Sequence, residues 1–306
     1  MDPRRPVLTI GHSPDADDAF MWWALGDAGP ESGREVRPPL FEPVGRFLFR
    51  PVMADIEALN RRAMERGDLD ITAISAHAYP HAKGAYALTS CGASVGDGFG
   101  PKVVAREALG IDWLRNGDPL IAVPGERTSA FLALCLLLGK GFRFAVTPFE
   151  RIIDEVRSGA ADAGLVIHEG QLTFGDAGLH QVVDLGAWWK ERTALPLPLG
   201  LNAVRRDLDE RFGPGAGREA ARALRASIDY ALRKRPVGLE HAMKYARGIT
   251  VGQADRFVNM YVNAWTRDLG PRGVQAISMF LKAGHEAGLC PDPGLIDVVE
   301  SAQRHS

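Results

Sequence analysis

The sequence predicts an α/β fold of two lobes with a ligand cleft between them. A pattern of amphipathic helix, glycine, aspartate three residues later and short apolar strand occurs twice, at residues 56–74 and 149–167. A polar residue follows each strand, Ser75 in the first copy and His168 in the second. Strands that alternate with helices favour a mostly parallel sheet in each lobe, and open α/β sheets bind ligands at the carboxyl ends of their strands. We therefore expect Ser75 and His168 to face each other across the cleft.

Composition limits the class of protein. The 306 residues are enough for two domains, and contents of 46% hydrophobic and 24% charged residues are ordinary for a globular protein. A formal net charge of −2 provides no electrostatic attraction for nucleic acid or for an anionic membrane. The apolar stretches are shorter than the ~20 residues that span a bilayer. We therefore expect a small-molecule partner, with neither nucleic acid nor a membrane involved.

The expected compartment is the cytoplasm. Residues 1–6 lead directly into the first strand, without the apolar core or the cleavage site of a signal peptide. Cys91, Cys135 and Cys290 are an odd number without Cys-x-x-Cys spacing, so neither a disulfide framework nor a zinc site is expected. The sequence gives no indication of the oligomeric state.

Both lobes open with the same order of elements, a strand, a loop and a helix. The predicted ranges are 7–10, 11–18 and 19–25 in the first lobe, and 120–123, 124–127 and 128–138 in the second. The regular alternation again favours a mostly parallel sheet in each lobe.

Two strands, at 102–105 and 197–204, carry the chain from one lobe to the other. They divide it into a larger lobe, residues 1–106 and 197–306, and a smaller lobe, residues 107–196, which carries His168. Two crossings make a hinge that suits closure around a ligand. After residue 215 we expect helices, punctuated by prolines, at 218–233, 238–245, 254–265 and 273–287.

Two hydroxyl residues, Thr128 and Ser129, lie where the helix after strand 120–123 begins. Unpaired N–H groups and the helix dipole make such a turn suitable for an anion, especially a carboxylate. A hydroxyl at this place can equally cap the helix. Both interpretations stay open, because capping and binding can coexist.

The acidic loop that contains Asp15, Asp17 and Asp18 suggests a hard cation, since such ions take carboxylate oxygens. Negative charge is, however, favoured before a helix in any case, and no second acidic cluster completes a ligand set. We therefore expect no metal. A dinucleotide fingerprint, a Walker A motif and a nucleophile elbow are all missing from the sequence, so we expect no cofactor and no serine-hydrolase chemistry.

His168 has two interpretations, a catalytic group in the cleft or a hydrogen-bonded structural histidine. His12, His77 and His81 flank the same predicted cleft and compete for a catalytic role. Packing or capping suits His77 and His81 better, because they follow Ser75 at a predicted helix start.

Four stretches between residues 164 and 208 carry a family resemblance. They are Gly-Leu-Val-Ile-His-Glu at 164–169, Gln-Val-Val-Asp-Leu-Gly-Ala-Trp-Trp at 181–189, Leu-Pro-Leu-Pro-Leu-Gly at 195–200 and Arg-Arg-Asp-Leu at 205–208. These stretches resemble the 1,4-dihydroxy-6-naphthoate synthase family of the futalosine pathway of menaquinone biosynthesis. Weaker similarity extends from about residue 7 to residue 290.

The resemblance implies a type II periplasmic-binding-protein fold recruited to catalysis. It implies a lyase that converts cyclic dehypoxanthinyl futalosine, a substrate with a carboxylate, to 1,4-dihydroxy-6-naphthoate, with His168 as the general base. An imidazole with an ordinary pKa of ~6.5 suits a base at neutral pH. The residues implied to bind the substrate are Ser13, Ala73, Ser75, Thr128, Ser129 and Ala130.

The chain also departs from the family. Asp15 and Asp17 stand where family members carry cysteine and asparagine, and Ala73 stands where they can carry lysine. These differences favour one alternative, a related enzyme of the same fold with another substrate, such as one similar to chorismate dehydratase. A second alternative is a solute-binding protein of a transporter, since fold does not determine function. The imidazole in the predicted cleft favours an enzyme.

Overall fold

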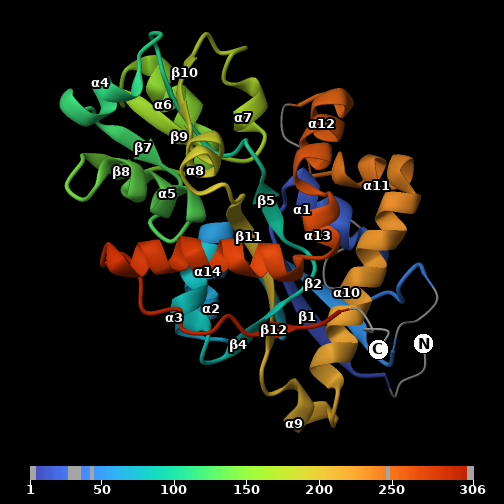
Figure 1. Cartoon of the computed structure of the whole chain (residues 1–306). Coiled ribbons are helices and arrows are strands. Elements are labelled where there is room, and N and C mark those ends of the chain that lie inside the picture. The colour runs from blue at the N-terminus through green and yellow to red at the C-terminus, as the bar shows by residue number, and fades with distance from the viewer. Residues whose placement is uncertain (1–4, 27–35, 42–44, 246–248, 302–306) are drawn as a thin grey trace.

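The computed structural model describes residues 5–26, 36–41, 45–245 and 249–301, and it contains two β-sheets with helices packed around them (Figure 1). One sheet has seven strands and the other has five. Figure 1 shows the smaller sheet at the top, in green, and the larger sheet below it, with α14 running across the front. The predicted α/β fold class is confirmed.

The larger sheet has the strand order β12-β4-β11-β3-β1-β2, and β5 pairs with β11. Strand β1 is parallel to both β2 and β3, whereas β11 is antiparallel to β3. The strands are β1 (Val7–His12), β2 (Leu48–Met53), β3 (Ile71–Ser75), β4 (Tyr86–Thr89), β5 (Ser94–Gly96), β11 (Leu197–Arg205) and β12 (Val298–Val299).

The smaller sheet repeats this plan, with the order β10-β6-β9-β7-β8. Strand β7 is parallel to both β8 and β9, and β6 is antiparallel to β9. The strands are β6 (Lys102–Ala105), β7 (Ile121–Val123), β8 (Phe144–Val146), β9 (Ala163–Val166) and β10 (His180–Asp184). The lobe boundaries at residues 106 and 197 remain a prediction.

The repeated pattern of the sequence has the same structural role in both sheets. Helix α2 (Ile56–Glu65) is followed by Gly67 and helix α6 (Ile152–Ser158) by Gly159, each in the left-handed region that a helix end favours, with φ of 57° and 84°. Asp70 accepts a hydrogen bond from the backbone N–H of Thr9 at 2.8 Å, and Asp162 accepts one from that of Leu120 at 2.9 Å. Each aspartate therefore ties its own strand to the parallel neighbour.

Helices cover both sheets. They are α1 (Ala16–Trp22), α2 (Ile56–Glu65), α3 (Tyr79–Ala82), α4 (Ile111–Asn116), α5 (Ser129–Leu138), α6 (Ile152–Ser158), α7 (Gly170–Thr173), α8 (Leu185–Thr193), α9 (Leu208–Phe212), α10 (Ala216–Arg233), α11 (Arg235–Ala242), α12 (Val251–Tyr261), α13 (Ala264–Arg267) and α14 (Gly270–Glu286). None of the helices in the described ranges has the length and apolar character that a bilayer span requires.

Several predicted boundaries were wrong. The first helix begins at Ala16 rather than at residue 19, so Asp17 and Asp18 lie in its first turn and not in the loop before it. The helix predicted at 254–265 is two helices, because Asn263 leaves the helical conformation and caps α13. The prolines predicted to separate helices lie in the first turns of α11 and α14, where a missing N–H costs nothing.

The largest apolar core joins the two sheets. Val123 and Leu165 of the smaller sheet belong to the same buried cluster as Leu201 of the larger sheet, and Phe280 of α14 is also part of it. The core therefore holds the two sheets against each other.

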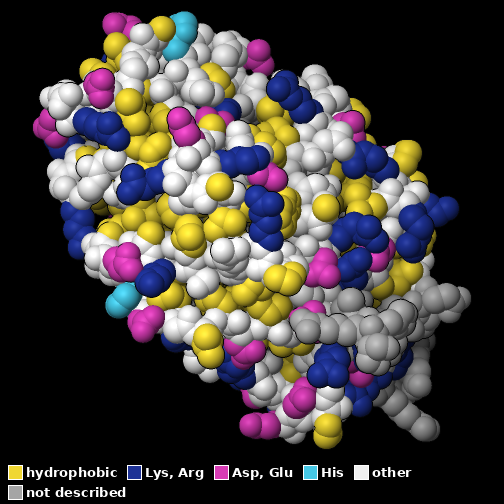
Figure 2. All heavy atoms as spheres, in the orientation of Figure 1, with side chains coloured by type: hydrophobic (Ala, Val, Ile, Leu, Met, Phe, Trp, Pro, Cys, Tyr) yellow, Lys and Arg dark blue, Asp and Glu magenta, His cyan; other side chains and the backbone are white. Residues whose placement is uncertain are grey.

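On the face drawn in Figure 2, basic and acidic side chains are interspersed rather than gathered into a patch of one sign.

Candidate active site

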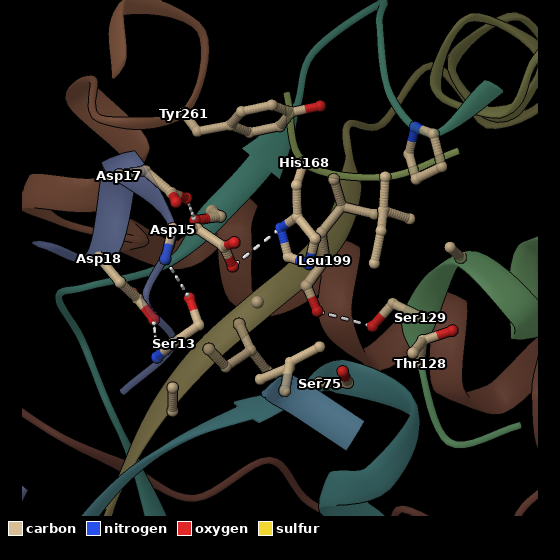
Figure 3. Close-up of a pocket in the computed structure, with 18 of the residues that line it drawn as sticks. Ser13, Asp15, Asp17, Asp18, Ser75, Thr128, Ser129, His168, Leu199 and Tyr261 are labelled. Atoms are coloured by element: carbon tan, nitrogen blue, oxygen red, sulfur yellow. Dashed lines mark hydrogen bonds and ion pairs between the residues drawn. The ribbon is translucent and has the colours of Figure 1, made fainter. Parts of the chain in front are cut away.

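A cavity lies where the two sheets meet. Its lining comes from β3 and β11 of the larger sheet, from the first turns of α1 and α5, and from the turn after β9 (Figure 3). Every residue that the sequence nominated for the site lines it, namely Ser13, Ala73, Ser75, Thr128, Ser129, Ala130 and His168. The cavity therefore brings together the nominated residues of both lobes.

His168 is held by the carboxylate of Asp15, which lies just before α1. The histidine lies two residues beyond the end of β9 and has a φ of 51°, which is uncommon for a residue other than glycine. Its Nδ1 lies 2.9 Å from Oδ2 of Asp15, as the dashed line in Figure 3 marks. The ring of Phe149 meets it edge-on at 4.6 Å between centroids. Nε2 is buried and has no hydrogen-bond partner among the described residues.

The charge of His168 differs from the expectation. Burial lowers the pKa of the imidazole, but the Asp15 carboxylate, its hydrogen bond and the nearby Glu169 and Asp17 outweigh burial and raise the pKa to about 10. The expected pKa of ~6.5 was therefore wrong, because it left out the carboxylate that the fold brings to Nδ1. The ring carries a proton at neutral pH.

We call Asp15, Asp17, Asp18 and His168 the acidic side of the cavity. Ser94 Oγ donates to Oδ2 of Asp17 at 3.0 Å, and the backbone N–H of Ser13 donates to Oδ2 of Asp18 at 2.8 Å. Burial first, and then the neighbouring Asp18 and Asp15, raise the pKa of Asp17 to about 8. Burial likewise raises the pKa of Asp18, against the opposing effect of His12. Asp17 is therefore mostly protonated at neutral pH.

A second contact joins the turn after β9 to α1. Glu169 Oε1 accepts a hydrogen bond from the backbone N–H of Ala16 at 3.2 Å, at the start of α1, where negative charge is favoured. Burial raises the pKa of Glu169.

In the described part of the chain, no group of three or more histidine, cysteine or acidic side chains is placed to hold a metal ion.

We call Ser75, Thr128, Ser129 and Ala130 the helix-start side of the cavity. Thr128 is the N-cap of α5, because its Oγ1 accepts from the backbone N–H of Phe131 at 3.1 Å. Ser129 is not the cap, and its Oγ donates to the backbone oxygen of Leu199 at 2.6 Å (Figure 3). The first N–H groups of a helix lack partners within it, so those of Ser129 and Ala130 remain available to an anion.

Ser75 is oriented by Asn60 of α2. Its Oγ accepts a hydrogen bond from Asn60 Nδ2 at 3.0 Å, and its backbone N–H donates to Asn60 Oδ1 at 2.8 Å. Both amide atoms of Asn60 are therefore used to hold one residue of the cavity wall.

The competing histidines are packed elsewhere. His77 has ring nitrogens 3.3 Å from the backbone oxygens of Thr128 and Leu289, and burial lowers its pKa to about 4. His12 is fully buried, with Nδ1 2.8 Å from the backbone oxygen of Ser13. Among the described residues that line the cavity, the one histidine is His168.

Comparison with known proteins identifies the family. A family model described as menaquinone biosynthesis matches residues 8–286. The chain belongs to this family. It is 38% identical over 289 residues to the 1,4-dihydroxy-6-naphthoate synthase of Thermus thermophilus, covering 94% of this chain and 97% of the relative. It is 35% identical over 293 residues to the enzyme of the same name from Streptomyces coelicolor, covering 94% and 96%. The family resemblance and the expectation of an enzyme are confirmed.

Solved structures support the fold of this menaquinone biosynthesis family member. Protein AF1704 from Archaeoglobus fulgidus is 40% identical and superposes with a TM-score of 0.80, covering 92% of this chain and 98% of that one. The alkanesulfonate-binding protein SsuA from Xanthomonas axonopodis is 13% identical with a TM-score of 0.70, covering 96% and 98%. The second likeness is one of fold alone, and it agrees with the expected type II periplasmic-binding-protein architecture.

Sequence reasoning missed several residues that line the cavity of this family member. Tyr261 OH donates to Gln171 Oε1 at 2.7 Å, and both side chains are buried. Asn202 lies on the return strand β11, inside a run that the sequence marked only as a crossing. A polar residue in a strand that is otherwise apolar was the signal that could have found Asn202.

Proposed function

We propose that the chain is a lyase that converts cyclic dehypoxanthinyl futalosine to 1,4-dihydroxy-6-naphthoate, with His168 as the general base. The observation that carries the proposal is the imidazole of His168, whose Nε2 lies buried and unpartnered in the cavity wall while Asp15 holds Nδ1. Membership of the menaquinone biosynthesis family and the names of the two relatives support the choice of reaction. A cytoplasmic location is part of the same proposal.

In this mechanism Asp15 keeps the proton of His168 on Nδ1, so that Nε2 accepts the proton that leaves the substrate carbon. The electron pair of that C–H bond forms the new double bond as the bond to the leaving oxygen breaks. Asp17, mostly protonated at neutral pH, supplies a proton to that oxygen. The base role requires the neutral ring and the acid role requires protonated Asp17, so the catalytic rate rises with pH to about 8, stays level to about 10 and falls above that.

The helix-start side is the proposed site of the substrate carboxylate. The N–H groups of Ser129 and Ala130 carry the positive end of the α5 dipole, and the hydroxyl of Ser75 lies beside them in the cavity wall. Held there, the substrate has its reacting carbon oriented toward His168, and the bound substrate displaces water from the cavity.

A second candidate is an enzyme of the same fold with a different substrate, such as a dehydratase acting on a related carboxylate. One observation favours it. Three aspartates line the cavity, and no lysine or arginine is among its described lining residues. Among the described lining residues, the protonated His168 and backbone N–H groups are therefore the groups left to pair with a substrate carboxylate.

The test is direct. Purified protein is incubated with cyclic dehypoxanthinyl futalosine, and the product is identified by mass and retention time, with His168→Asn as the matched control. Release of 1,4-dihydroxy-6-naphthoate by the wild type and not by the variant supports the proposal. Tight binding without turnover would instead identify a solute-binding protein, and turnover of chorismate in place of the futalosine derivative would identify the second candidate.

A further inference from the structure

Asn202 contributes a buried amide oxygen to the cavity. Its side chain lines the cavity and the residue is only 2% exposed. Nδ2 donates to the backbone oxygen of Gly92 at 2.8 Å, which identifies the other atom of the amide as the oxygen. This Oδ1 is buried and has no hydrogen-bond partner in the described part of the chain. Because buried polar atoms are almost always hydrogen-bonded in folded proteins, the oxygen is an acceptor suited to a ligand.

Gly92 determines how this amide is oriented. The glycine has a φ of 87°, a conformation that other residues rarely adopt. A Cβ added to it would lie 2.6 Å from Nδ2 of Asn202. Only glycine therefore allows the amide to rest against this backbone oxygen, with Oδ1 left as the free acceptor.

Ala73 is the cross-strand neighbour of Asn202. The two residues are directly paired in the antiparallel ladder between β3 and β11, so their side chains lie on the same face. Both line the cavity, and a methyl group offers no charge to a ligand. A carboxylate placed here would meet the Asn202 oxygen with no lysine or arginine among the described lining residues to offset the repulsion. A hydroxyl would instead donate to that oxygen.

Asp17 also lines the cavity, and its carboxyl, mostly protonated at neutral pH, has the protonated His168 as a charged neighbour. Ser94, which donates to its carboxyl, is paired in register with Gly200, two residues before Asn202 along β11. Asp17 and Asn202 both line the cavity, and both are buried. The Asn202 oxygen is uncharged and has no lysine or arginine beside it among the described lining residues, so it favours a neutral donor group over an anion.

We propose that Asn202 accepts a hydrogen bond from a hydroxyl group of the substrate, whose carboxylate then lies at the start of α5. The assignment rests on the proposed function, in which the product carries its two hydroxyls on one ring and its carboxylate on the other. Asn202 thereby determines which end of the molecule enters first, as a specificity residue that takes no part in proton transfer.

The experiment compares two naphthoates that differ only in the hydroxyls. Dissociation constants of 1,4-dihydroxy-6-naphthoate and of unsubstituted 2-naphthoate are measured by calorimetry under anaerobic, reducing conditions. The wild type should bind the dihydroxy compound about 10-fold more tightly, the value of a hydrogen bond to a buried acceptor. In Asn202→Leu this ratio should fall to about 1, since no oxygen remains to accept, while the affinity for 2-naphthoate is unchanged.

Three further variants sharpen the comparison. Ser129→Ala is the matched control, because it alters the carboxylate end and should weaken both compounds by the same factor. Ala73→Lys places a cation beside the Asn202 oxygen and should reduce or reverse the preference for the hydroxyls. Asn202→Ala is measured beside Asn202→Leu, with a thermal melt of each, so that a single misfolded variant does not decide the result.

Each outcome has one meaning. A wild type that binds neither naphthoate overturns the proposed function and this inference with it. Binding of both compounds with the 10-fold ratio intact in Asn202→Leu overturns the inference alone. Loss of 2-naphthoate binding in both Asn202 variants would show that the amide supports the fold rather than the hydroxyls, and would also overturn it.

Discussion

The two sides of the cavity are built in opposite ways. The acidic side consists of buried titratable groups, and Asp15 and His168 are joined across 153 residues of chain, on opposite sides of the junction between the sheets. The helix-start side consists of hydroxyls and backbone N–H groups that carry no charge. The hydroxyl of Thr128 accepts a hydrogen bond from the N–H of Phe131, and that of Ser75 accepts one from Asn60, so both partners lie within 15 residues along the chain.

This contrast separates chemistry from binding. Buried charges close to one another shift each other's pKa, and the pKa of His168 is raised to about 10 and that of Asp17 to about 8. Neutral hydroxyls and helix N–H groups hold a ligand in the same way at every working pH. Variants of the acidic side should therefore change turnover and its pH dependence, whereas variants of the helix-start side should change affinity or stability.

The largest effect is expected for His168→Asn. Turnover should fall by roughly 10²–10⁴-fold, the usual contribution of a general base, with little change in KM because the ring is used mainly for proton removal. Steady-state kinetics with cyclic dehypoxanthinyl futalosine measure both constants. Near-normal turnover in this variant would falsify the mechanism and leave the acidic side without a catalytic role.

Asp15→Asn should move the pH profile. In the wild type, kcat/KM should rise with pH to about 8, where Asp17 begins to lose its proton, and then stay level up to the His168 pKa of about 10. Asp15 is the principal group that raises this pKa against burial, so its neutral replacement lowers the pKa and shifts the rise to lower pH by roughly one to three units.

Profiles of kcat/KM between pH 6 and 11 test this shift, with Ser94→Ala as a control that leaves the His168 partner in place. A profile that stays at the same pH in Asp15→Asn contradicts the pairing. A wild-type rate that falls between pH 6 and pH 8 would assign His168 the role of an acid instead of a base.

Ser129→Ala should have a smaller effect, confined to binding. Its hydroxyl donates to the backbone oxygen of Leu199, so it positions the wall of the cavity and takes no part in proton transfer. Removing one neutral hydrogen bond should raise KM roughly 3- to 10-fold with kcat within about 2-fold. The same kinetic assay separates the two constants, and a fall in kcat larger than the rise in KM would place the chemistry on the helix-start side.

The smallest effect is expected for Thr128→Ala. Loss of the N-cap of α5 should cost about 1 kcal/mol of unfolding free energy, which corresponds to a melting temperature lower by about 2–4 °C. Thermal unfolding followed by circular dichroism measures it, with Thr128→Ser as the variant that keeps the cap. An equal loss in Thr128→Ser would argue against capping as the source of the stability.

The elements of the fold that depend on neighbouring residues could be predicted from the sequence. The helix–glycine–aspartate–strand pattern identified both copies of the repeated unit, because helix periodicity and a left-handed glycine are local properties. The nominated site residues all line one cavity for a related reason, since parallel strands end at the same edge of a sheet.

Boundaries at the site were less predictable. The first helix begins three residues earlier than expected, and Glu169, 153 residues away in sequence, accepts from the N–H of Ala16 at its start. A distant acceptor of this kind leaves no mark in the local sequence. The separate helix α13 has a local cause, the cap supplied by Asn263.

By itself, the sequence determined the fold class, the family and some of the residues that line the cavity. Tertiary structure alone decided their electrostatics, because the pKa of His168 depends on Asp15 lying 2.9 Å from Nδ1 in a buried site. It also decided the role of Asn202, whose free oxygen follows from the pairing of its Nδ2 with Gly92. Charge interactions and hydrogen bonds depend on distance in space and on burial, and neither quantity is written in the order of residues along the chain.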